Sequence, residues 1–353
     1  MINRFNLLLL LILFSISYSQ CDEGEVILWE SCYSIEMTTA VFNSETTSGA
    51  IPSEICELIN LEIIDLEVMW GGTNQVTGEI PNCIGDLSNL TYLNLAWNYL
   101  YGEIPESIGN LANLTSLSLL SNAFSGEIPE SIGGLTNLTY LNLGFNAFSG
   151  GIPESIGNLE ELTEFYITSN QISGRLPYSI GNLSELTMLS IFDNQISEQI
   201  PESIGNLNNL ISLNAAYNNL SGQIPSSIGE LVNLERLWLN YNNLSGEIPD
   251  SICNLESLNW SAFGFEGDDS YVNFNQLCPP YPECIVDYVG DQNVSECMEF
   301  ELGDVNSDNE INVLDIVEMV NLALLGEFNF LGDLNADGFL DVLDIIIVMN
   351  IIL

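Results

Sequence analysis

The sequence predicts an α/β solenoid, a stack of similar coils with short parallel strands on the concave face, joined to a small all-α domain. The solenoid is predicted by a proline that recurs every 24 residues from Pro81 onward, and by leucines that keep one register within each step. The all-α domain is predicted by two acidic twelve-residue segments near the end of the chain. The prolines stand at positions 52, 81, 105, 129, 153, 177, 201, 225 and 249.

One coil shows the register L-x-x-L-x-L-x-x-N-x-L at Leu90, Leu93, Leu95, Asn98 and Leu100. A period of roughly 20 to 29 residues in this register is typical of a leucine-rich repeat solenoid, in which each coil buries its apolar edge only against its neighbours. The Leu-x-Leu pair alternates with polar residues, as expected of a short strand with one buried face. On the far side of the coil, the proline fixes φ and the Ile and Leu that follow it return to the core.

The irregular steps of the proline ladder indicate where the domains end. The steps that end at Pro81 and Pro282 span 29 and 33 residues, with insertions around Val68–Thr73 and Phe263–Ser270. Both insertions fall in terminal coils, where caps are expected. We therefore expect a signal peptide at residues 1–19, an N-terminal cap at 20–60, the solenoid at 61–284, a C-terminal cap and linker at 285–302, and the all-α domain at 303–353.

The start of the chain predicts export. Arg4 precedes an apolar run over residues 7–14, and Ser17-Tyr18-Ser19 follows, which is the pattern of a secretory signal peptide cut before Gln20 or Cys21. No later run reaches the roughly 18 apolar residues that a membrane span needs, because the stretch 345–353 is short and contains Asn350. We expect a secreted, extracellular or cell-surface protein with no transmembrane segment.

Composition excludes several kinds of chemistry. Three basic residues, Arg4, Arg175 and Arg236, stand against 49 acidic ones, and the chain has no Lys and no His. This balance excludes nucleic acid as a main ligand, because binding phosphates needs clustered Lys and Arg. Without His there is no Ser–His or Cys–His pair, and without Lys there is no Schiff base and no P-loop. The acidity fits either solubility in a saline medium or affinity for cations.

Eight cysteines cluster at the two ends of the solenoid, which predicts disulfide caps in an exported chain. If each group of four pairs within itself, three connectivities remain at each end. Cys56 and Cys83 stand four and two residues after their prolines, and Cys253 and Cys284 stand at the same offsets. Our hypothesis pairs Cys56 with Cys83 and Cys253 with Cys284. The remaining pairs are then Cys21 with Cys32 and Cys278 with Cys297.

Two segments 29 residues apart, DVNSDNEINVLD at 304–315 and DLNADGFLDVLD at 333–344, predict two Ca²⁺ sites. Calcium takes six to eight oxygen ligands, and alternate residues of a tight loop direct their side chains to one point. Gly338 suits the sharp turn at position 6 of the second loop, and Asn309 is the usual substitute in the first. The side-chain ligands expected at positions 1, 3, 5, 9 and 12 are Asp304, Asn306, Asp308, Asn312 and Asp315, then Asp333, Asn335, Asp337, Asp341 and Asp344. Backbone carbonyls are expected from Glu310 and Phe339 at position 7.

The SGEIPESIGNL form of the repeat, over roughly residues 50 to 284, closely resembles the leucine-rich repeats of plant receptor ectodomains. The resemblance implies a role for the Asn eight places after the first Leu of each coil. In that family this Asn bonds backbone groups of the neighbouring coil, which satisfies the need of buried polar groups for partners. In this chain it stands at positions 98, 122, 146, 170, 194, 218 and 242.

The C-terminal segment resembles a type I dockerin. Position 12 of each loop is Asp rather than Glu, and an apolar helix is expected after each loop, at residues 313–325 and 342–353, with no clear helix before it. The resemblance implies that calcium binding folds the domain. It also implies that positions 10 and 11 of each loop contact a cohesin partner. Those residues are Val313 and Leu314, then Val342 and Leu343. The alternatives are that they face the domain's own core, bind another partner or dock on the solenoid.

Aromatic residues at the exposed strand positions predict a ligand-binding face. Asn94, Asn142, Asn214 and Asn240 lie between them. Because rings stack on sugars and anchor peptides equally well, the ligand is an extracellular protein or a glycan. The aromatic residues are Tyr92, Trp97, Tyr140, Phe145, Tyr166, Phe192, Tyr217, Trp238 and Tyr241.

Together these features favour a secreted, non-catalytic binding protein whose solenoid recognises an extracellular ligand and whose dockerin-like domain tethers it. The alternatives are a hydrolase component of a cellulosome-like assembly that degrades polysaccharide, or a structural matrix protein. A glycosidase needs two carboxylates roughly 5 to 10 Å apart in a cleft. Most glutamates here repeat in every coil, as at Glu103, Glu106, Glu127 and Glu130, and a residue copied in every coil is seldom a unique catalyst.

Overall fold

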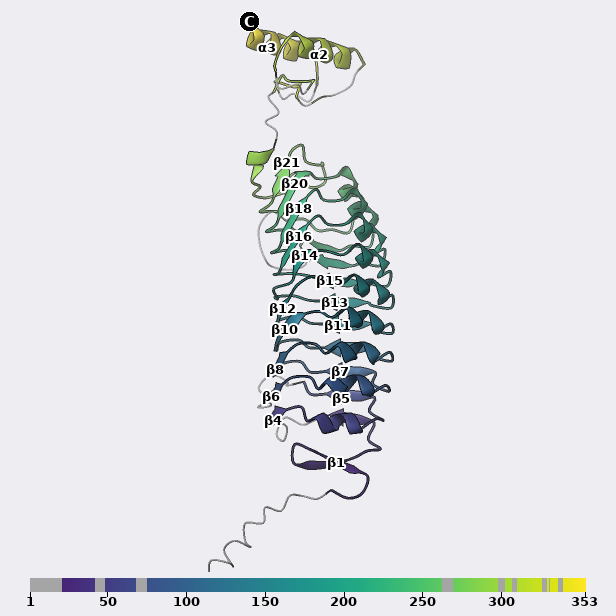
Figure 1. Ribbon diagram of the computed structural model, residues 1–353. Coiled ribbons are helices and arrows are strands. Elements are labelled where there is room, and N and C mark those ends of the chain that lie inside the picture. Colours follow the sequence, from purple (N-terminus) through teal and green to yellow (C-terminus); the bar gives the residue numbers. More distant parts are fainter. Residues whose placement is uncertain are drawn as a thin grey trace, which may run out of the picture. The chain divides into compact units, whose positions relative to one another are not determined.

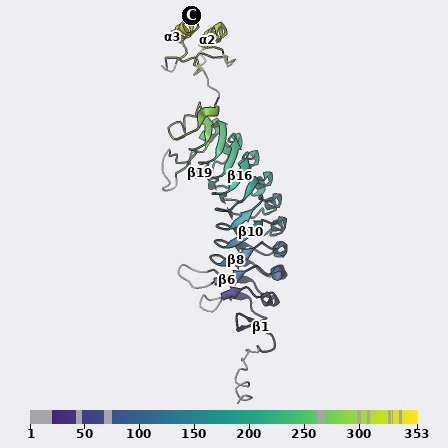
Figure 2. The same ribbon diagram turned by 60° about the vertical axis from the view of Figure 1, so that its left-hand side comes forward.

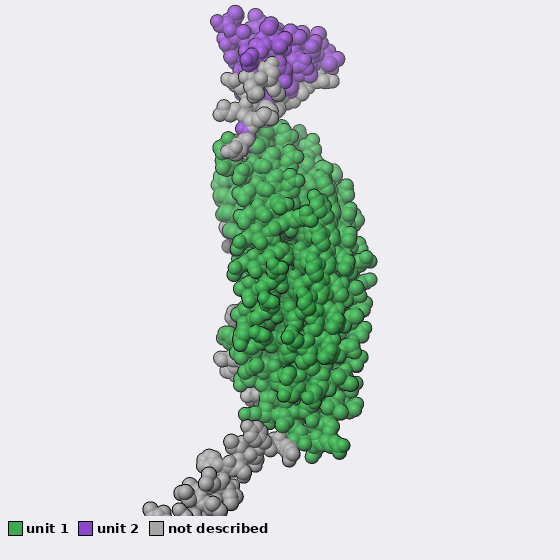
Figure 3. Space-filling model, viewed as in Figure 1, with its two compact units in different colours: residues 1–295 green, residues 296–353 purple. Residues whose placement is uncertain are grey.

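A computed structural model describes residues 21–41, 48–67, 75–261, 269–297, 302–306, 310–325, 329, 331–335 and 339–353. The expected signal peptide, the insertion at Val68–Thr73 and most of the insertion at Phe263–Ser270 lie outside these residues. The chain forms two compact units, residues 1–295 and 296–353 (Figure 3). The second unit therefore begins at Glu296, where the sequence analysis places its start at residue 303.

The first unit is a stack of coils, in which the Leu-x-Leu pairs form one parallel sheet (Figure 1). Each strand is three residues long, and Leu117 pairs with Leu93 on one side and Leu141 on the other. The sheet begins with β3, inside the segment expected to be the cap. Its described strands are β3 (Thr39–Val41), β5 (Ile63–Asp65), β7 (Tyr92–Asn94), β9 (Ser116–Ser118), β11 (Tyr140–Asn142), β13 (Glu164–Tyr166), β15 (Met188–Ser190), β17 (Ser212–Asn214) and β19 (Arg236–Trp238).

A second row of parallel strands follows the Asn of each coil, and the sequence analysis did not anticipate it. Most of its strands contain a glycine at positive φ, such as Gly102 at 87°, a conformation that glycine adopts without a steric penalty. Two sheets make up the row. One contains β4 (Ser48–Ala50), β6 (Gln75–Gly78), β8 (Tyr99–Gly102), β10 (Ala123–Glu127) and β12 (Ala147–Ser149); the other contains β14 (Ser173–Arg175), β16 (Gln195–Glu198), β18 (Asn219–Gly222), β20 (Asn243–Glu247) and β21 (Gln276–Cys278).

Short 3₁₀ helices close the coils on the side away from the first sheet, each beginning directly after a proline of the ladder (Figure 2). They place Ile108 and Leu111 in the core with no exposed surface. Gly109 is required because a Cβ there would lie 2.2 Å from the carbonyl oxygen of Ser131 in the next coil. These helices are η1 (Ser53–Glu57), η2 (Asn82–Asp86), η3 (Glu106–Asn110), η4 (Glu130–Gly134), η5 (Glu154–Asn158), η6 (Tyr178–Asn182), η7 (Glu202–Asn206), η8 (Ser226–Glu230) and η9 (Asp250–Asn254). A further short helix, η10 (Val294–Glu296), lies at the junction of the two units.

The repeated Asn joins each coil to its neighbours, which confirms the role that the family resemblance implies. The Asn146 side chain donates through Nδ2 to the carbonyl oxygen of Leu119, one coil back, at 2.9 Å. Its Oδ1 accepts the backbone N–H of Phe124 at 3.1 Å. The same pair of bonds recurs along the ladder and ends with Asn275, which donates to Leu239 and accepts from Leu244. The ladder thus satisfies backbone groups that the turn of the chain leaves without strand partners.

Disulfide bonds cross-link both ends of the first unit. Cys56 is bonded to Cys83 and Cys253 to Cys284, each joining a terminal coil to its neighbour. Cys278 is also disulfide-bonded, as is Cys297 at the start of the second unit. At the start of the chain, Cys21 bonds to Cys32 across the antiparallel pair β1 (Glu25–Leu28) and β2 (Ser31–Ser34).

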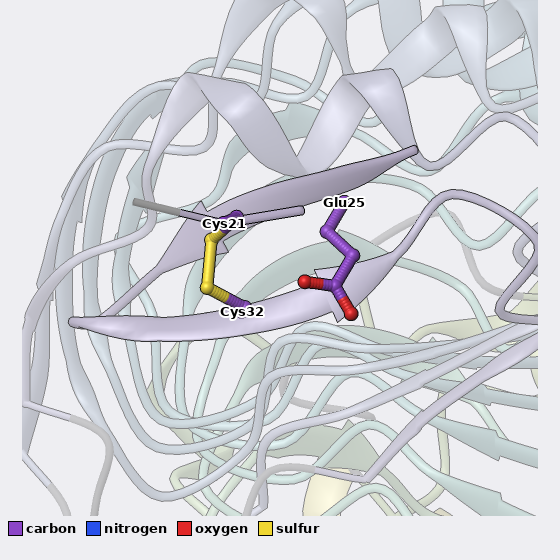
Figure 4. A group of neighbouring side chains, drawn as sticks. All are labelled: Cys21, Glu25 and Cys32. Carbon is purple, nitrogen blue, oxygen red and sulfur yellow. A yellow bond between two sulfur atoms is a disulfide. The ribbon is translucent and has the colours of Figure 1, made fainter. Parts of the chain in front are cut away.

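A carboxylate lies beside this first disulfide. Figure 4 shows Glu25 near Cys21 and Cys32, with the three potential ligand atoms within 4.8 Å of one another. A metal would need thiolates, and both sulfurs are committed to the disulfide. The group is therefore a covalent staple of the hairpin and not a metal site.

The second unit consists of two loops, each followed by a helix. The helices are α2 (Val313–Leu325) and α3 (Val342–Ile352), close to the ranges that the sequence predicts. Val305, Met319, Leu331 and Val348 form its small core, and each half of the repeat contributes two of them. None of the helices among the described residues is long and apolar enough to cross a membrane.

Candidate functional site

The first candidate site is the loop before α2. Asp315 accepts two backbone N–H groups, from Asn306 at 3.1 Å and from Asn312 at 2.8 Å. The Asn312 side chain caps α2 by accepting the N–H of Leu314 at 2.8 Å, and it donates to the carbonyl oxygen of Glu310 at 3.2 Å. The predicted ligands at positions 3, 7, 9 and 12 are thus tied to one another.

The second loop repeats this arrangement. Asp344 accepts the N–H groups of Asn335 at 3.2 Å and of Asp341 at 3.0 Å. Asp341 caps α3 by accepting the N–H of Leu343 at 2.7 Å. Because the same bonds form at the same positions in both loops, the two loops share one architecture.

Burial of the carboxylates indicates that each loop is built for a cation. Asp315 and Asp344 have no exposed surface and Asp304 is 5% exposed, whereas Asp333 is half-buried. A buried carboxylate is costly unless a positive group compensates it, and no basic residue follows Arg236 in the sequence. A ligand set made only of oxygen suits a hard cation such as calcium. Asp308 and Asp337, the predicted ligands at position 5, lie outside the described residues, as do Asn309 and Gly338.

The second candidate site is the solvent-facing side of the nine-stranded sheet together with the turns that follow it, hereafter the ligand face. In the described coils, the residue before each ladder Asn has a φ between 52° and 57°, a region that bulky residues seldom adopt. Aromatic rings nevertheless occupy this position at Trp97, Phe145, Tyr217, Tyr241 and Phe274. The sequence analysis expected the first four at strand positions, but they lie in the turns that follow the strands.

At its C-terminal end, the ligand face carries a stack of rings. Tyr217 stacks on Tyr241 and Tyr241 on Phe274, with ring centroids 4.3 Å apart in each pair. Phe192 meets Tyr217 edge-on at 5.4 Å. Trp238 lines a pocket beside this stack.

Elsewhere on the ligand face the predicted aromatic residues are more dispersed. The ring centroids of Tyr140 and Tyr166 are 6.0 Å apart. Tyr92 and Tyr140 both line one pocket of about 320 Å³. The side chains of Trp97 and Phe145 are 43% and 55% exposed, outside that pocket and outside the C-terminal stack. The structure therefore gathers only part of the predicted set into one place.

Family comparisons decide what the two units are. A model of the leucine-rich repeat region matches residues 61–174, and the single leucine rich repeat matches residues 185–207, 209–231 and 233–255. The dockerin type I domain matches residues 302–353. The chain is a leucine-rich repeat protein with a C-terminal type I dockerin domain. No curated protein matches the sequence.

Solved structures similar to the leucine-rich repeat domain include receptor ectodomains of plants. The plant peptide hormone receptor RGFR1, in complex with RGF2, is 37% identical with a TM-score of 0.60, over 65% of this chain and 35% of that one. The Arabidopsis receptor kinase HAESA, in complex with the peptide hormone IDA and the co-receptor SERK1, is 36% identical with a TM-score of 0.62, over 70% and 39%. A leucine-rich repeat protein of Leptospira interrogans is 26% identical with a TM-score of 0.51, over 72% and 70%. The chain therefore spans little more than a third of each of the two plant receptors.

The dockerin domain exposes the residues at positions 10 and 11 of both loops. Val313, Leu314, Val342 and Leu343 are between 54% and 64% exposed, which excludes the alternative that they face the core of the domain. The exposed apolar surface continues along both helices at Val317 and Val320, then at Ile346 and Met349, which sequence reasoning missed. The helical spacing of these residues from positions 10 and 11 is the signal that could have found them.

Burial and hydrogen bonding raise the pKa values of several tyrosines of the leucine-rich repeat domain. Burial, followed by a 2.8 Å hydrogen bond that its hydroxyl donates to Glu164, holds the pKa of Tyr166 well above its usual range. Burial also raises the pKa of Tyr92, and the nearby Asp65 carboxylate adds to the effect. Burial and a hydrogen bond with Tyr241 raise the pKa of Tyr217. These phenols stay neutral donors over the physiological pH range.

The final coil contributes residues to the ligand face that sequence reasoning missed. Tyr271, Asn273 and Phe274 follow the long insertion and continue the rows that end in the previous coil with Trp238, Asn240 and Tyr241. The segment YVNFNQL at 271–277 repeats WLNYNNL at 238–244 position by position. Aligning the two segments across the 33-residue step would have found them.

The repeated glutamates do not resemble a catalytic pair. Two pairs of glutamates line an open groove beside the 3₁₀ helices, each pair at equivalent places in successive coils: Glu103 with Glu127, and Glu106 with Glu130. Arg175 pairs with Glu154 there at 2.9 Å. Although burial acts to raise it, hydrogen bonds from Arg175 and Ser179 lower the pKa of Glu154 overall. A general acid of a glycosidase needs the opposite shift.

Proposed function

We propose that the protein is a secreted, non-catalytic binding protein. Its leucine-rich repeat domain recognises an extracellular protein or glycan, and its dockerin domain binds two calcium ions and tethers the protein to a cohesin-type partner. The cysteines support export, because they are disulfide-bonded and such bonds persist in oxidising compartments.

One observation carries the tethering half of the proposal. In each loop, the aspartate at position 12 is fully buried while the two apolar residues just before it are more than half exposed. A loop that places a carboxylate inward for a cation therefore presents Val313 and Leu314, or Val342 and Leu343, outward. Exposed apolar residues at matched positions of a duplicated unit fit a partner-binding surface with two equivalent halves.

The recognition half rests on the ligand face. Aromatic residues are enriched at binding hot spots, and here they occupy backbone positions that disfavour bulky side chains. The plant receptors whose structures resemble this domain are solved in complex with peptide hormones, which supports a protein or peptide ligand. The stacked rings are equally suited to a sugar.

Binding of the full chain to an immobilised type I cohesin, measured in calcium and then in chelator, tests the tethering role. We expect binding in calcium, loss of binding in chelator, and loss on charging both apolar pairs with V313D, L314D, V342D and L343D. Charging one pair alone should leave binding through the other half. The matched control is V232D, which charges an equally exposed valine of the leucine-rich repeat domain. Binding that survives both the chelator and the fourfold variant would refute this role.

A further inference from the structure

A pocket of about 150 Å³ opens on the ligand face around β17 and β19. Four aromatic residues line it, Phe192, Tyr217, Trp238 and Tyr271, together with Asn240 and the small Ala216. Its lining contains no charged side chain. Aromatic walls with a few polar groups are the usual composition of a small-molecule or single-residue binding pocket.

The pocket exists because one coil has a small residue where its neighbours have larger ones. Ala216 stands between Phe192 and Asn240, which hold the same register in the coils before and after it. Backbone hydrogen bonds fix the surrounding coils, with Ala215 donating to Trp238 at 2.9 Å and Tyr217 to Asn240 at 3.1 Å. The cavity is therefore part of a rigid sheet edge.

Asn240 supplies a buried polar group that the fold does not use. Its side chain is only 4% exposed, and its Oδ1 accepts no hydrogen bond from the described protein. Asn273, one coil further on and 8% exposed, has an Oδ1 in the same condition. A buried acceptor without a donor is costly, and such groups in native proteins call for an explanation.

Other asparagines of the ligand face differ. Asn94, Asn142 and Asn214 each use Oδ1 to accept the backbone N–H two residues further on. Several buried serine hydroxyls among the described residues also lack a hydrogen-bond partner, but they recur at one register of the coils and so belong to the repeat. They are those of Ser107, Ser131, Ser155, Ser179 and Ser227. The acceptors of Asn240 and Asn273 occur only in the last two coils, beside the aromatic pocket, and so belong to a site.

The charges restrict what the pocket binds. The net charge of −46 repels an anion, and the pocket lining has no carboxylate to bind a cation. The ligand is therefore neutral, has flat apolar faces for the rings, and offers hydrogen-bond donors to the Asn240 amide oxygen. A neutral sugar meets all three conditions, since its hydroxyls donate and its ring faces are apolar.

We propose that this pocket binds a single neutral sugar residue of a glycan chain, with Asn240 accepting one of its hydroxyls. The proposal rests on the recognition role of the leucine-rich repeat domain and names its ligand class. It assigns Trp238 and Tyr217 as the stacking walls and the adjoining Tyr241 and Phe274 rings as the surface along which the glycan continues.

Calorimetry of the full chain in calcium tests this proposal. The neutral probes are hexasaccharides of β-1,4-glucan, xylan and mannan, and an oligogalacturonate is the anionic comparison. Selection from a displayed peptide library tests peptides as the alternative ligand. We expect at least one neutral hexasaccharide to bind and to change the fluorescence of Trp238, while the oligogalacturonate does not bind. N240L keeps the volume and removes the acceptor, and should weaken binding by about tenfold or more without lowering the melting temperature. A216L fills the pocket and should abolish binding. Y99L alters an exposed ring on β8, outside the ligand face, and should leave affinity within about twofold.

The outcomes separate this proposal from the general recognition role. Sugar binding that N240L and A216L leave unchanged would overturn the pocket assignment, while recognition by the domain would stand. Binding of peptides or of the oligogalacturonate in place of neutral sugars would also overturn it and leave recognition intact. Failure of every probe to bind would overturn the sugar proposal and count against the recognition role as well. Loss of folding in A216L leaves the decision to N240L.

Discussion

The carboxylate of Asp315 accepts a hydrogen bond of 3.1 Å from the backbone N–H of Asn306, nine residues earlier in the chain. Asp344 makes the equivalent bond to Asn335 at 3.2 Å. Each bond ties the end of a loop to its start and directs a buried carboxylate inward. Because no basic residue follows Arg236 in the sequence, no side chain of this region compensates the negative charge of the loops, and we expect a bound cation to do so.

Removing calcium should therefore unfold the dockerin domain and leave the leucine-rich repeat domain folded. All five tryptophans lie between residues 29 and 260, so their fluorescence reports only on the repeats. Circular dichroism at 222 nm should fall on addition of chelator as α2 and α3 melt, while tryptophan emission stays constant. Helical signal that persists unchanged in chelator would show that the loops do not need the metal.

Single substitutions sharpen this test. D315N removes one negative oxygen and should weaken calcium binding by about tenfold or more, since ligand charge sets the affinity of such loops. D344N should act equally on the second loop. E318Q is the control, because Glu318 is exposed on α2 and lies outside the loops. An effect of E318Q as large as that of D315N would mean that overall charge, and not ligation, controls binding.

Breaking the asparagine ladder should destabilise the solenoid. N146A removes one of the two donors to the carbonyl of Leu119 and leaves the N–H of Phe124 without its acceptor, and should lower the free energy of unfolding by about 2 to 4 kcal/mol. N137A is the matched control, since Asn137 is exposed and makes one bond, to Ala112 at 2.7 Å. Its loss should cost less than about 1 kcal/mol. Equal losses in urea denaturation would show that the ladder contributes no more than surface bonds do.

The repeat period explains why so much of the fold can be predicted. Leu93, Leu117 and Leu141 recur at a fixed step, so one coil's register places every other coil. The same regularity identified the paired positions of Cys56 and Cys83. The two matched twelve-residue segments likewise predicted two loops, each followed by a helix. The period does not predict the second row of strands. Gly102 and its equivalents indicate a turn, but they do not indicate that the segment also pairs with the neighbouring coils.

The pocket could not be predicted for a different reason. It depends on one small residue, Ala216, between two larger ones, and on Asn240 lacking a donor. The sequence shows that Ala216 stands between Phe192 and Asn240, but the cavity and the unused acceptor appear only when side chains of three coils are placed together. The sequence does show that Asn240 and Asn273 share a register, but not that their oxygens are unused while that of Asn214 is bonded.

Raised tyrosine pKa values predict a loss of stability at alkaline pH. The folded pKa of Tyr166 exceeds its unfolded value of about 10, so its contribution is complete below that pH and is lost as the pH rises through the folded pKa. Tyr92 and Tyr217 act in the same direction. The free energy of unfolding, measured in urea, should therefore fall above about pH 10. Phenolate absorbance at 295 nm should appear at a higher pH in the folded protein than in the urea-unfolded protein.

Two variants assign this effect to Tyr166. Y166F removes the phenol and should flatten the alkaline fall in stability. E164Q keeps a hydrogen-bond acceptor but removes the charge, so it should lower the pKa of Tyr166 only part of the way, since burial is the largest cause of its shift. A pH profile identical in wild type and Y166F would exclude this tyrosine as a source.

Rings at positive φ should separate stability from binding. Phe145 has a φ of 55° and is 55% exposed, so F145N places a residue that tolerates this conformation and should leave the free energy of unfolding unchanged or raise it by up to about 1 kcal/mol. Y217N makes the same exchange at the same φ, but it removes a ring stacked on Tyr241 at 4.3 Å and in edge contact with Phe192. It should cost about 1 to 2 kcal/mol, because each aromatic pair contributes beyond its buried area. Urea denaturation of the two variants decides between these expectations. A clear loss in F145N would show that exposed rings of the ligand face stabilise the coil, which would remove strain as a reason to regard them as binding residues.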